Sequence, residues 1–266
     1  MSRMTCADPG HKPGYDLEFS DDFDGPELDL AKWLPAYLPQ WSSREQAAAR
    51  YRLGEGQLRL QIVEDQPPWC PAHDGATRVS SLQTGVFAGP PGSPFGQHRF
   101  HPELRVVEAQ TNARLYTPQY GYIELRARAS AARDCMVALW MIGYEDLPER
   151  SGEICICEIF GKDVQPGSAR VGMGVRAFSD PNLVGDFSQE LVEMDATDFH
   201  VYAAEWTPAG IDFFIDGRRA KTVNQSPGYP MQLMLGIYEL DPRGDYPKEF
   251  VVDYVRGYRT KRDATP

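Results

Sequence analysis

The feature that most constrains this chain is the recurrence of short runs rich in Val, Ile, Tyr and Phe between clusters of Gly, Pro, Asp and Asn. Stretches with helical periodicity are scarce, and only residues 44–50, with their run of alanines, are predicted to be helical. Short apolar runs between turn residues are typical of antiparallel strands. We therefore predict strands over residues 57–63, 120–129, 136–142, 153–160, 169–178, 200–206, 210–215, 231–237 and 250–258.

The turns between these runs predict a sandwich or barrel that forms a single domain. Asp216 and Gly217 separate two β-like runs and tolerate the positive φ angles of a tight hairpin turn. The Pro-rich segments 66–71 and 89–94 are predicted to be surface loops, because proline cannot pair inside a sheet. With 266 residues and 42% hydrophobic content, one large core is expected. We predict a single domain over residues 15–260, with tails at 1–14 and 261–266.

Charge and composition limit the classes of molecule that this chain is expected to bind. The formal net charge of −11 disfavours nucleic acid and anionic membranes, so a neutral ligand and a monomer are expected. No apolar run approaches the ~18 residues of a membrane span, and the first residues lack the pattern of a signal peptide, which leaves the location open. The five cysteines include no CxxC pair, which argues against a zinc or thioredoxin-like site and favours buried thiols.

The most informative segment is the run from Ser151 to Gly161, in which two glutamates lie five positions apart. In a regular strand Glu153 would share a face with Cys155 and Cys157, and Glu158 would lie on the opposite face. A β-bulge, which adds one residue to the strand, would bring Glu158 onto the face of Glu153. The segment therefore predicts a bulged strand with both carboxylates on one face.

Two carboxylates on one face suit the hydrolysis of a glycosidic bond. One carboxylate attacks the anomeric carbon, and the other protonates the departing oxygen and then activates a water molecule. Their pKa values must diverge, so that the nucleophile is ionised and the acid is protonated. The alternative is a pair of surface glutamates on an edge strand, because this spacing is common.

The same residues resemble glycoside hydrolase family 16, whose members include laminarinases, lichenases, agarases and carrageenases. The family's motif, Glu-x-Asp-x-(x)-Glu with a hydrophobic pair, is similar to Glu153 to Gly161 in its longer form. The resemblance covers roughly residues 15–260 and implies a β-jelly roll, two curved antiparallel sheets with an open substrate cleft on the concave face. It is also carried by segments 19–25, 28–33, 41–58, 120–126, 138–143, 199–206, 215–217 and 252–256.

The resemblance implies roles for individual residues. It makes Glu153 the nucleophile and Glu158 the acid/base of a retaining endo-hydrolase of β-1,3 or mixed-linkage β-glucan. It further implies contacts with the saccharide substrate from Trp41, Arg44, Glu124, Arg126, Trp140 and Tyr238. The chemistry needs no cofactor. Some family members hold a structural calcium, for which Asp253 and Asp22 are the matching acids, and family members are usually secreted.

The chain departs from the family's pattern at a central position. Cys155 replaces the aspartate that is thought to hydrogen-bond the nucleophile, and a thiol is only a weak donor. The segment 170–178 also lacks the family's common histidine, and Arg176 is its candidate replacement in the cleft. These departures keep open a noncatalytic or weakly active carbohydrate-binding jelly roll. A thiol-based enzyme or sensor using Cys155 or Cys157 is a third alternative, although no histidine partner is evident.

Overall fold

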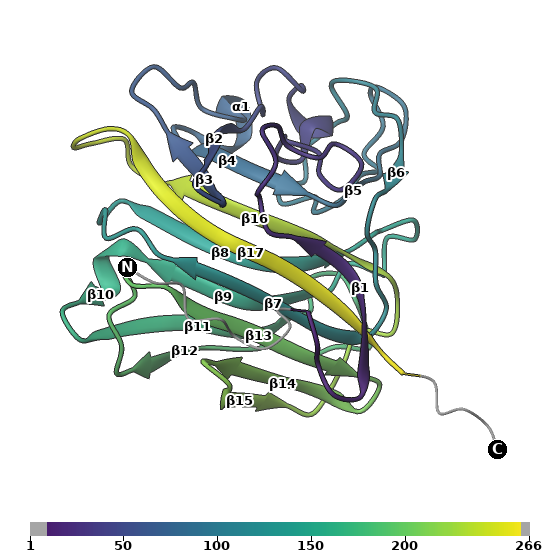
Figure 1. Cartoon of the computed structure of the whole chain (residues 1–266). Coiled ribbons are helices and arrows are strands. Elements are labelled where there is room, and N and C mark those ends of the chain that lie inside the picture. Colours follow the sequence, from purple (N-terminus) through teal and green to yellow (C-terminus); the bar gives the residue numbers. More distant parts are fainter. Residues whose placement is uncertain (1–9, 262–266) are drawn as a thin grey trace.

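Strands dominate the structure. In each apolar run, successive side chains point to opposite faces of a sheet, and at least one of these faces is buried. The structure, a computed structural model, describes residues 10–261 (Figure 1). One antiparallel sheet has eight strands: β1 (Tyr15–Asp21), β2 (Arg50–Gly54), β3 (Gln57–Ile62), β7 (Gly121–Arg128), β13 (His200–Thr207), β14 (Gly210–Ile215), β15 (Arg218–Val223) and β17 (Lys248–Thr260). All nine predicted strands form within the two large sheets, and the prediction of an all-β sandwich is confirmed.

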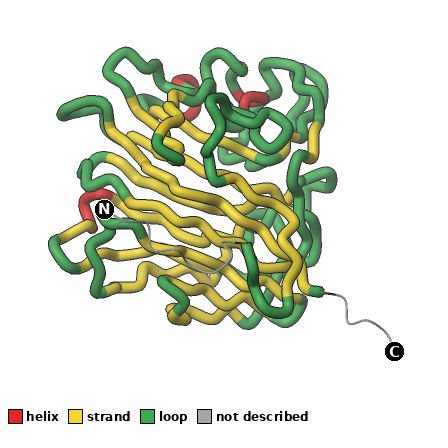
Figure 2. Tube along the Cα trace, viewed as in Figure 1, coloured by secondary structure: helices red, strands yellow, loops and turns green. Residues whose placement is uncertain are grey.

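The second sheet has seven strands, in the order β10-β11-β9-β8-β16-β4 with β12 beside β11. Its members are β4 (Arg78–Gln83), β8 (Cys135–Gly143), β9 (Glu153–Phe160), β10 (Val164–Gln165), β11 (Ser168–Arg176), β12 (Asp186–Val192) and β16 (Met231–Glu239). A small ribbon joins β5 (Gly85–Val86) to β6 (Ala113–Arg114), and the only helical turns among the described residues are η1 (Pro39–Trp41), α1 (Pro71–Asp74) and η2 (Gly161–Asp163). Figure 2 shows how little helix accompanies the strands.

The main core lies between the two sheets, and a second cluster covers the outer face of the seven-stranded sheet. Along β8, Val137, Leu139 and Met141 belong to the main core. Ala138, Trp140 and Ile142 point the other way, into a cluster formed with the segments that precede β8. This period of two is the one expected for a strand buried on both faces. The outer face of this sheet is therefore partly roofed by loops.

The hairpin prediction at Asp216 and Gly217 is confirmed. Both residues have positive φ, 48° and 74°, and they join β14 to β15. The helix predicted over residues 44–50 is wrong. That segment runs in turns and bridges back to residues 35–37, with the Tyr37 amide donating to the carbonyl of Ala47 at 3.0 Å. Burial of Ala47, which is fully covered, outweighs the local helical preference of the alanine run.

Several strands were absent from the sequence prediction because their residues are polar. β4 contains Ser80, Ser81 and Gln83, which are all fully buried. The Ser80 hydroxyl donates to the Gln61 carbonyl at 2.6 Å, and the Gln83 amide donates to the Gly85 carbonyl at 2.7 Å. Hydrogen bonds compensate the cost of burying these groups, but neither the bonds nor the burial leave a hydrophobic pattern.

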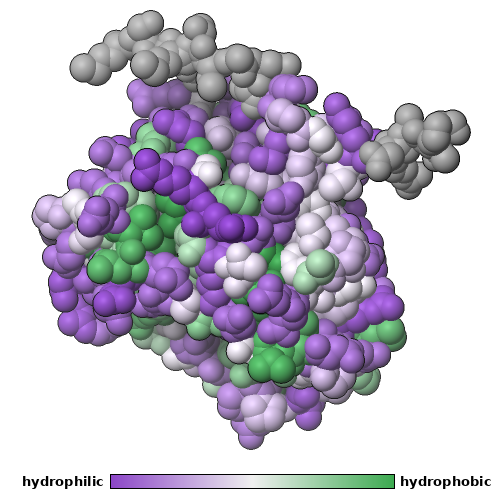
Figure 3. Space-filling view, turned by 90° about the horizontal axis from the view of Figure 1, so that it is seen from below, coloured by the Kyte–Doolittle hydropathy of each residue, from purple (hydrophilic) through white to green (hydrophobic). Residues whose placement is uncertain are grey.

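The remaining features of the fold are its chain ends and its surface. Residues 1–9 and 262–266, which include most of the two predicted tails, lie outside the described residues, and the single domain over 15–260 stays a prediction. Strands β1 and β17, near the two ends, pair with each other. Figure 3 shows one face on which hydrophilic residues predominate and hydrophobic ones form separate patches. Among residues 10–261, no helix has the length and apolar character to cross a bilayer.

Candidate active site

Strand β9 contains the predicted bulge. Its pairing with β8 places Cys155 opposite Trp140 and Cys157 opposite Leu139, so Ile156 is the extra residue between two adjacent partners. The pairing of β9 with β11 shifts at the same place. Because an extra residue turns the following part of a strand over, the faces before and after Ile156 are exchanged.

The bulge sends the residues of β9 to two opposite faces of the sheet. Ile154, Ile156 and Cys157 point into the main core between the sheets. Glu153 and Glu158 point outward, where both contact the same arginine. The prediction that a bulge brings the two glutamates to one face is confirmed. Cys157 has left the face that it would share with Glu153 in a regular strand.

Arg176, at the end of β11, joins the two carboxylates. It is paired across the sheet with Glu153, to which its Nη1 donates a hydrogen bond. Its Nη2 lies 3.1 and 3.3 Å from the two carboxylate oxygens of Glu158. The ring of Phe187, on the neighbouring strand β12, packs 3.8 Å from the guanidinium carbon. The candidate cleft residue Arg176 therefore lies at the centre of the site, supported from one side by an aromatic ring.

The pKa of Glu153 differs from the sequence-based expectation because its side chain is buried. Burial raises the pKa of Glu153 to about 7, the positive charge and hydrogen bond of Arg176 oppose this, and the neighbouring Glu158 adds to it. The expectation placed the higher pKa on the acid. The structure raises the pKa of Glu153, the residue matched to the nucleophile, because its side chain is only 5% exposed.

Cys155 lies between the two glutamates on β9. Its thiol is 3.7 Å from the carbonyl oxygen of Gly172. Burial raises the pKa of Cys155 well above the usual thiol range, with the negative charges of Glu153 and Glu158 adding to the effect. A thiol in this setting stays protonated, whereas a nucleophilic cysteine needs a lowered pKa. The geometry disfavours the thiol-based alternative.

We expect the described cysteines to resist alkylation in the folded protein. Cys70, Cys135, Cys155 and Cys157 are all buried, and burial raises the thiol pKa at each of them. The pKa of Cys135 and of Cys157 rises to about 12, which leaves about one such thiol in 10⁴ ionised at pH 8. Iodoacetamide followed by peptide mapping should leave Cys155 unmodified in the native protein and modify it fully in urea. Rapid native labelling of Cys155 would show that the site is open and its thiol ionised.

Aromatic rings form the floor beside the carboxylates. Trp140, opposite Cys155 in the β8–β9 pairing, lies on the same face as the glutamates. Its indole N–H donates to the hydroxyl of Tyr238 at 2.9 Å, and the ring of Tyr37 packs edge-on against Tyr238 at 5.4 Å. Trp140 and Tyr238 are 6% and 5% exposed. The structure thus brings these two predicted residues together next to the glutamates, each largely covered by its neighbours.

His98 is part of the site that the sequence does not reveal. Its ring lies 5.2 Å from that of Trp140, and burial together with the charge of Arg176 lowers the pKa of His98 to about 4. The histidine is therefore neutral at physiological pH. It comes from a loop between β5 and β6, far from the glutamates in sequence and without a recognisable motif. Only the fold brings it here.

The predicted contacts from Glu124 and Arg126 are wrong. Both residues belong to β7 in the other sheet, whose inward residues Ile123 and Leu125 fill the main core. Alternation along the strand places Glu124 and Arg126 on the outer face of that sheet, with the whole core between them and Glu153. Glu124 accepts a hydrogen bond from the hydroxyl of Tyr258 at 3.2 Å, which gives it a structural role there.

Trp41 and Arg44 are not at the carboxylates either. Trp41 is 1% exposed, and its indole donates to the carbonyl of Gln97 at 2.8 Å, so neither ring face is available to a sugar. Trp41 is therefore a core residue. Arg44 is bound to the side chain of Gln110 at 2.9 Å on an exposed loop.

The acids matched to calcium are already paired. Asp253 binds Arg126 at 2.6 Å, and Asp22 binds Arg256 at 2.7 Å. A calcium ion would have to replace a guanidinium at each carboxylate, so this geometry gives the calcium prediction no support. Elsewhere in residues 10–261, His73, His101 and Glu103 bring three donor atoms within 4.8 Å of one another, a ligand set that could hold zinc.

Comparisons with known proteins identify the family of this chain. The model of the family "Glycosyl hydrolases family 16" matches residues 107–256. A β-glucanase from Rhodothermus marinus is 31% identical over 190 residues, which are 56% of this chain and 62% of the relative. The chain therefore spans less than two thirds of this curated relative.

The fold of this chain is similar to those of several solved structures. An endo-β-galactosidase from Clostridium perfringens that releases GlcNAcα1-4Gal is 33% identical, with a TM-score of 0.84 over 96% of this chain and 65% of that one. A laminarinase from a Flavobacterium species is 20% identical, with a TM-score of 0.62 over 92% of this chain and all of the other, and indicates the fold alone. The family match covers more than half of the chain, and the predicted resemblance is confirmed: this chain belongs to glycosyl hydrolase family 16.

Proposed function

We propose that this chain is a retaining endo-β-glycosidase with Glu153 as the nucleophile and Glu158 as the acid/base. The observation that carries the proposal is the bulge at Ile156, which brings both carboxylates to one face and to one arginine. A carbohydrate-binding protein without turnover has no need for two glutamates converging in this way. Trp140 is proposed as the platform beneath the sugar at the cleavage point.

The reaction follows from the two roles. A carboxylate oxygen of Glu153 bonds to the anomeric carbon while the glycosidic C–O bond breaks, and Glu158 gives its proton to the departing oxygen. Glu158, now ionised, takes a proton from water, whose oxygen displaces Glu153 from the anomeric carbon. Arg176 holds the two carboxylates in place and lowers the cost of ionising Glu153 in a buried setting.

Two substrate classes are supported by different relatives. Internal β-galactosidic bonds are favoured by the C. perfringens enzyme, whose similarity extends over 96% of this chain with a TM-score of 0.84. Internal β-1,3 or mixed-linkage glucosidic bonds are favoured by the R. marinus β-glucanase, whose similarity covers 56% of the chain. We place β-galactosides first because that similarity extends further, and keep β-glucans as the second class.

A panel of polysaccharides tests the proposal. Laminarin, mixed-linkage glucan, β-galactans and mucin-type glycans are each incubated with the protein, and new reducing ends are measured. We expect oligosaccharides from one class, and proton NMR should show the β-anomer of the new reducing end before mutarotation. The α-anomer appearing first would overturn the retaining mechanism. Saccharide binding with no cleavage of any polymer would instead support a carbohydrate-binding protein.

A further inference from the structure

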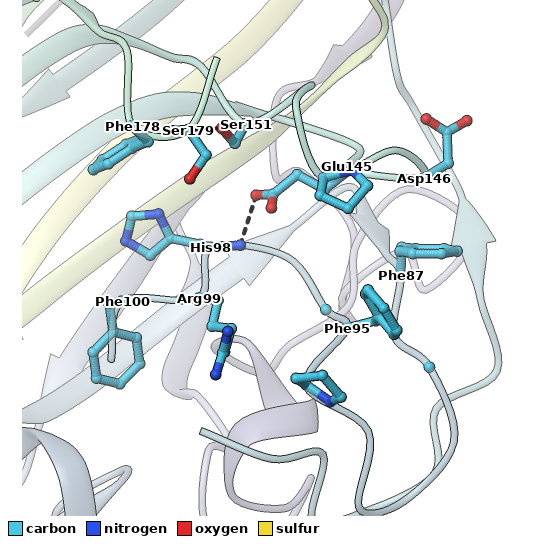
Figure 4. Close-up of a pocket in the computed structure, with 14 residues that line it drawn as sticks. Phe87, Phe95, His98, Arg99, Phe100, Glu145, Asp146, Ser151, Phe178 and Ser179 are labelled. Carbon is cyan, nitrogen blue, oxygen red and sulfur yellow. Dashed lines mark hydrogen bonds between the residues drawn. The ribbon is translucent and has the colours of Figure 1, made fainter. Parts of the chain in front are cut away.

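A pocket of about 720 Å³ lies beside the catalytic strands, within the usual range for small-molecule sites, on the order of 300–1,000 Å³. Glu145 follows β8, Ser151 precedes β9 and Phe178 follows β11, and all three line this pocket (Figure 4). Glu153 and Arg176 lie at the same ends of β9 and β11 and are paired with each other. The pocket therefore continues from the Glu153 end of the active site.

Aromatic rings line the pocket and face solvent. Phe95, Phe100 and Phe178 are 58%, 37% and 53% exposed, and they are the exposed phenylalanines among the described residues. Figure 4 shows Phe178 and Phe100 with His98 on one side of the pocket, and Phe87 with Phe95 on the other. Exposed aromatic clusters of this kind mark binding surfaces, and flat rings suit the CH faces of sugars.

The backbone is held in an unfavourable conformation at three positions of this pocket. His98, Glu145 and Phe178 have φ values of 49°, 55° and 44°, in the left-handed region that non-glycine residues avoid. Such conformations cost on the order of 1 kcal/mol each and cluster where function requires a particular side-chain direction. They come from three separate segments that meet at one pocket.

Glu145 is a polar group of this pocket that a hydrogen bond holds in position. One carboxylate oxygen accepts a hydrogen bond from the His98 amide at 2.6 Å. Within residues 10–261 the other oxygen has no hydrogen-bond partner. Burial raises the pKa of Glu145 to about 8, and the His98 amide opposes this. In contrast, the carboxylate of Asp146 is paired with Arg114 and Arg150.

We propose that this pocket binds a sugar unit of the substrate, with Glu145 hydrogen-bonding one of its hydroxyl or acetamido groups. The inference rests on the proposed endo-glycosidase function and adds a residue that selects the saccharide. The rings of Phe178 and Phe95 supply apolar contact, and the unpaired oxygen of Glu145 supplies a directional polar contact. Because burial raises the pKa of Glu145 to about 8, its carboxyl is largely protonated at neutral pH and contacts the sugar as a hydrogen-bonding group. Arg99 lines the same pocket and is a further polar group for the sugar.

Binding to ladders of oligosaccharides tests the inference. Isothermal titration calorimetry is performed on the Glu153→Gln protein with β-1,3-gluco- and β-1,4-galacto-oligosaccharides of two to five units. In one ladder, Kd should fall sharply at the length that reaches the pocket. Glu145→Ala and the exposed Phe178→Ala should each weaken binding roughly tenfold or more from that length onward. Glu145→Gln, which keeps an acceptor for the His98 amide, should lose less and serves as the variant with an intact fold.

The matched control is Glu149→Ala, an exposed glutamate on the same loop that does not line the pocket. It should leave the whole ladder unchanged. Equal weakening at every length, or none at any length, in both Glu145→Ala and Phe178→Ala would overturn the inference. Binding is measured on the Glu153→Gln protein, and cleavage is measured on the wild-type protein. If the length step is observed but the wild-type protein cleaves no polymer, the proposed function alone is overturned.

Discussion

Glu153→Gln is expected to reduce kcat at least about 10⁴-fold on the polysaccharide that the wild-type protein cleaves. The amide has nearly the same shape as the carboxylate, but it cannot form the glycosyl ester through which the reaction passes. The side chain is buried and adjacent to Arg176, so the variant also replaces a buried ion pair by a neutral contact. Thermal unfolding should accompany the kinetics, because a folded and inactive variant is the informative result. Glu149→Gln, on an exposed loop, should keep full activity.

Azide distinguishes the roles of the two glutamates. In Glu153→Ala, azide can enter the space of the lost carboxylate and attack the anomeric carbon directly, giving an α-glycosyl azide from a β-glycoside. In Glu158→Ala, an aryl glycoside with a good leaving group still forms the covalent intermediate, and azide then displaces Glu153 to give the β-glycosyl azide. Product NMR reads the anomer. Opposite anomers from those stated would exchange the assigned roles, and full activity in Glu153→Gln would remove the assignment altogether.

The sequence predicted the fold and the catalytic strand for identifiable physical reasons. The apolar strands β8, β9 and β16 fill the core, and such runs leave a clear pattern. The bulge in β9 was predictable because two glutamates five positions apart cannot both lie on one face of a regular strand. Polar strands such as β4, stabilised by buried side-chain hydrogen bonds, leave no such pattern.

The surroundings of the glutamates could not be predicted in the same way. The family resemblance placed Glu124 and Arg126 in the cleft, although they face away from it. Alternation along β7 could not correct this, because it allows either orientation until the core is known. His98 and Glu145 approach the site on loops whose course depends on long-range contacts. Arg176 was identified only as a replacement for a missing histidine. Its contact with both carboxylates depends on the register between β9 and β11.

Arg176→Met should reduce kcat/KM at pH 7 by about 10- to 100-fold, mainly by changing the ionisation of Glu153. Methionine is unbranched like arginine but shorter, so it loses the guanidinium that packs on Phe187 together with the charge that opposes the raised pKa of Glu153. The two glutamates would then face each other without a cation. A nucleophile must be ionised, so activity is gained as pH rises through the pKa of Glu153, which is about 7 with Arg176 present.

Removing Arg176 should therefore move the acid limb of the kcat/KM profile from near pH 7 upward by roughly one unit or more, so that part of the lost activity returns at high pH. The raised pKa of Glu153 also makes stability depend on pH, in the direction opposite to activity. A carboxyl whose pKa is higher in the folded than in the unfolded state loses stability as pH rises from about 4.5 through the folded pKa, and this loss should be larger in Arg176→Met. Arg170→Met, exposed on the same strand, is the control and should shift neither curve. An acid limb unmoved in Arg176→Met would mean that the arginine does not control the ionisation of the nucleophile.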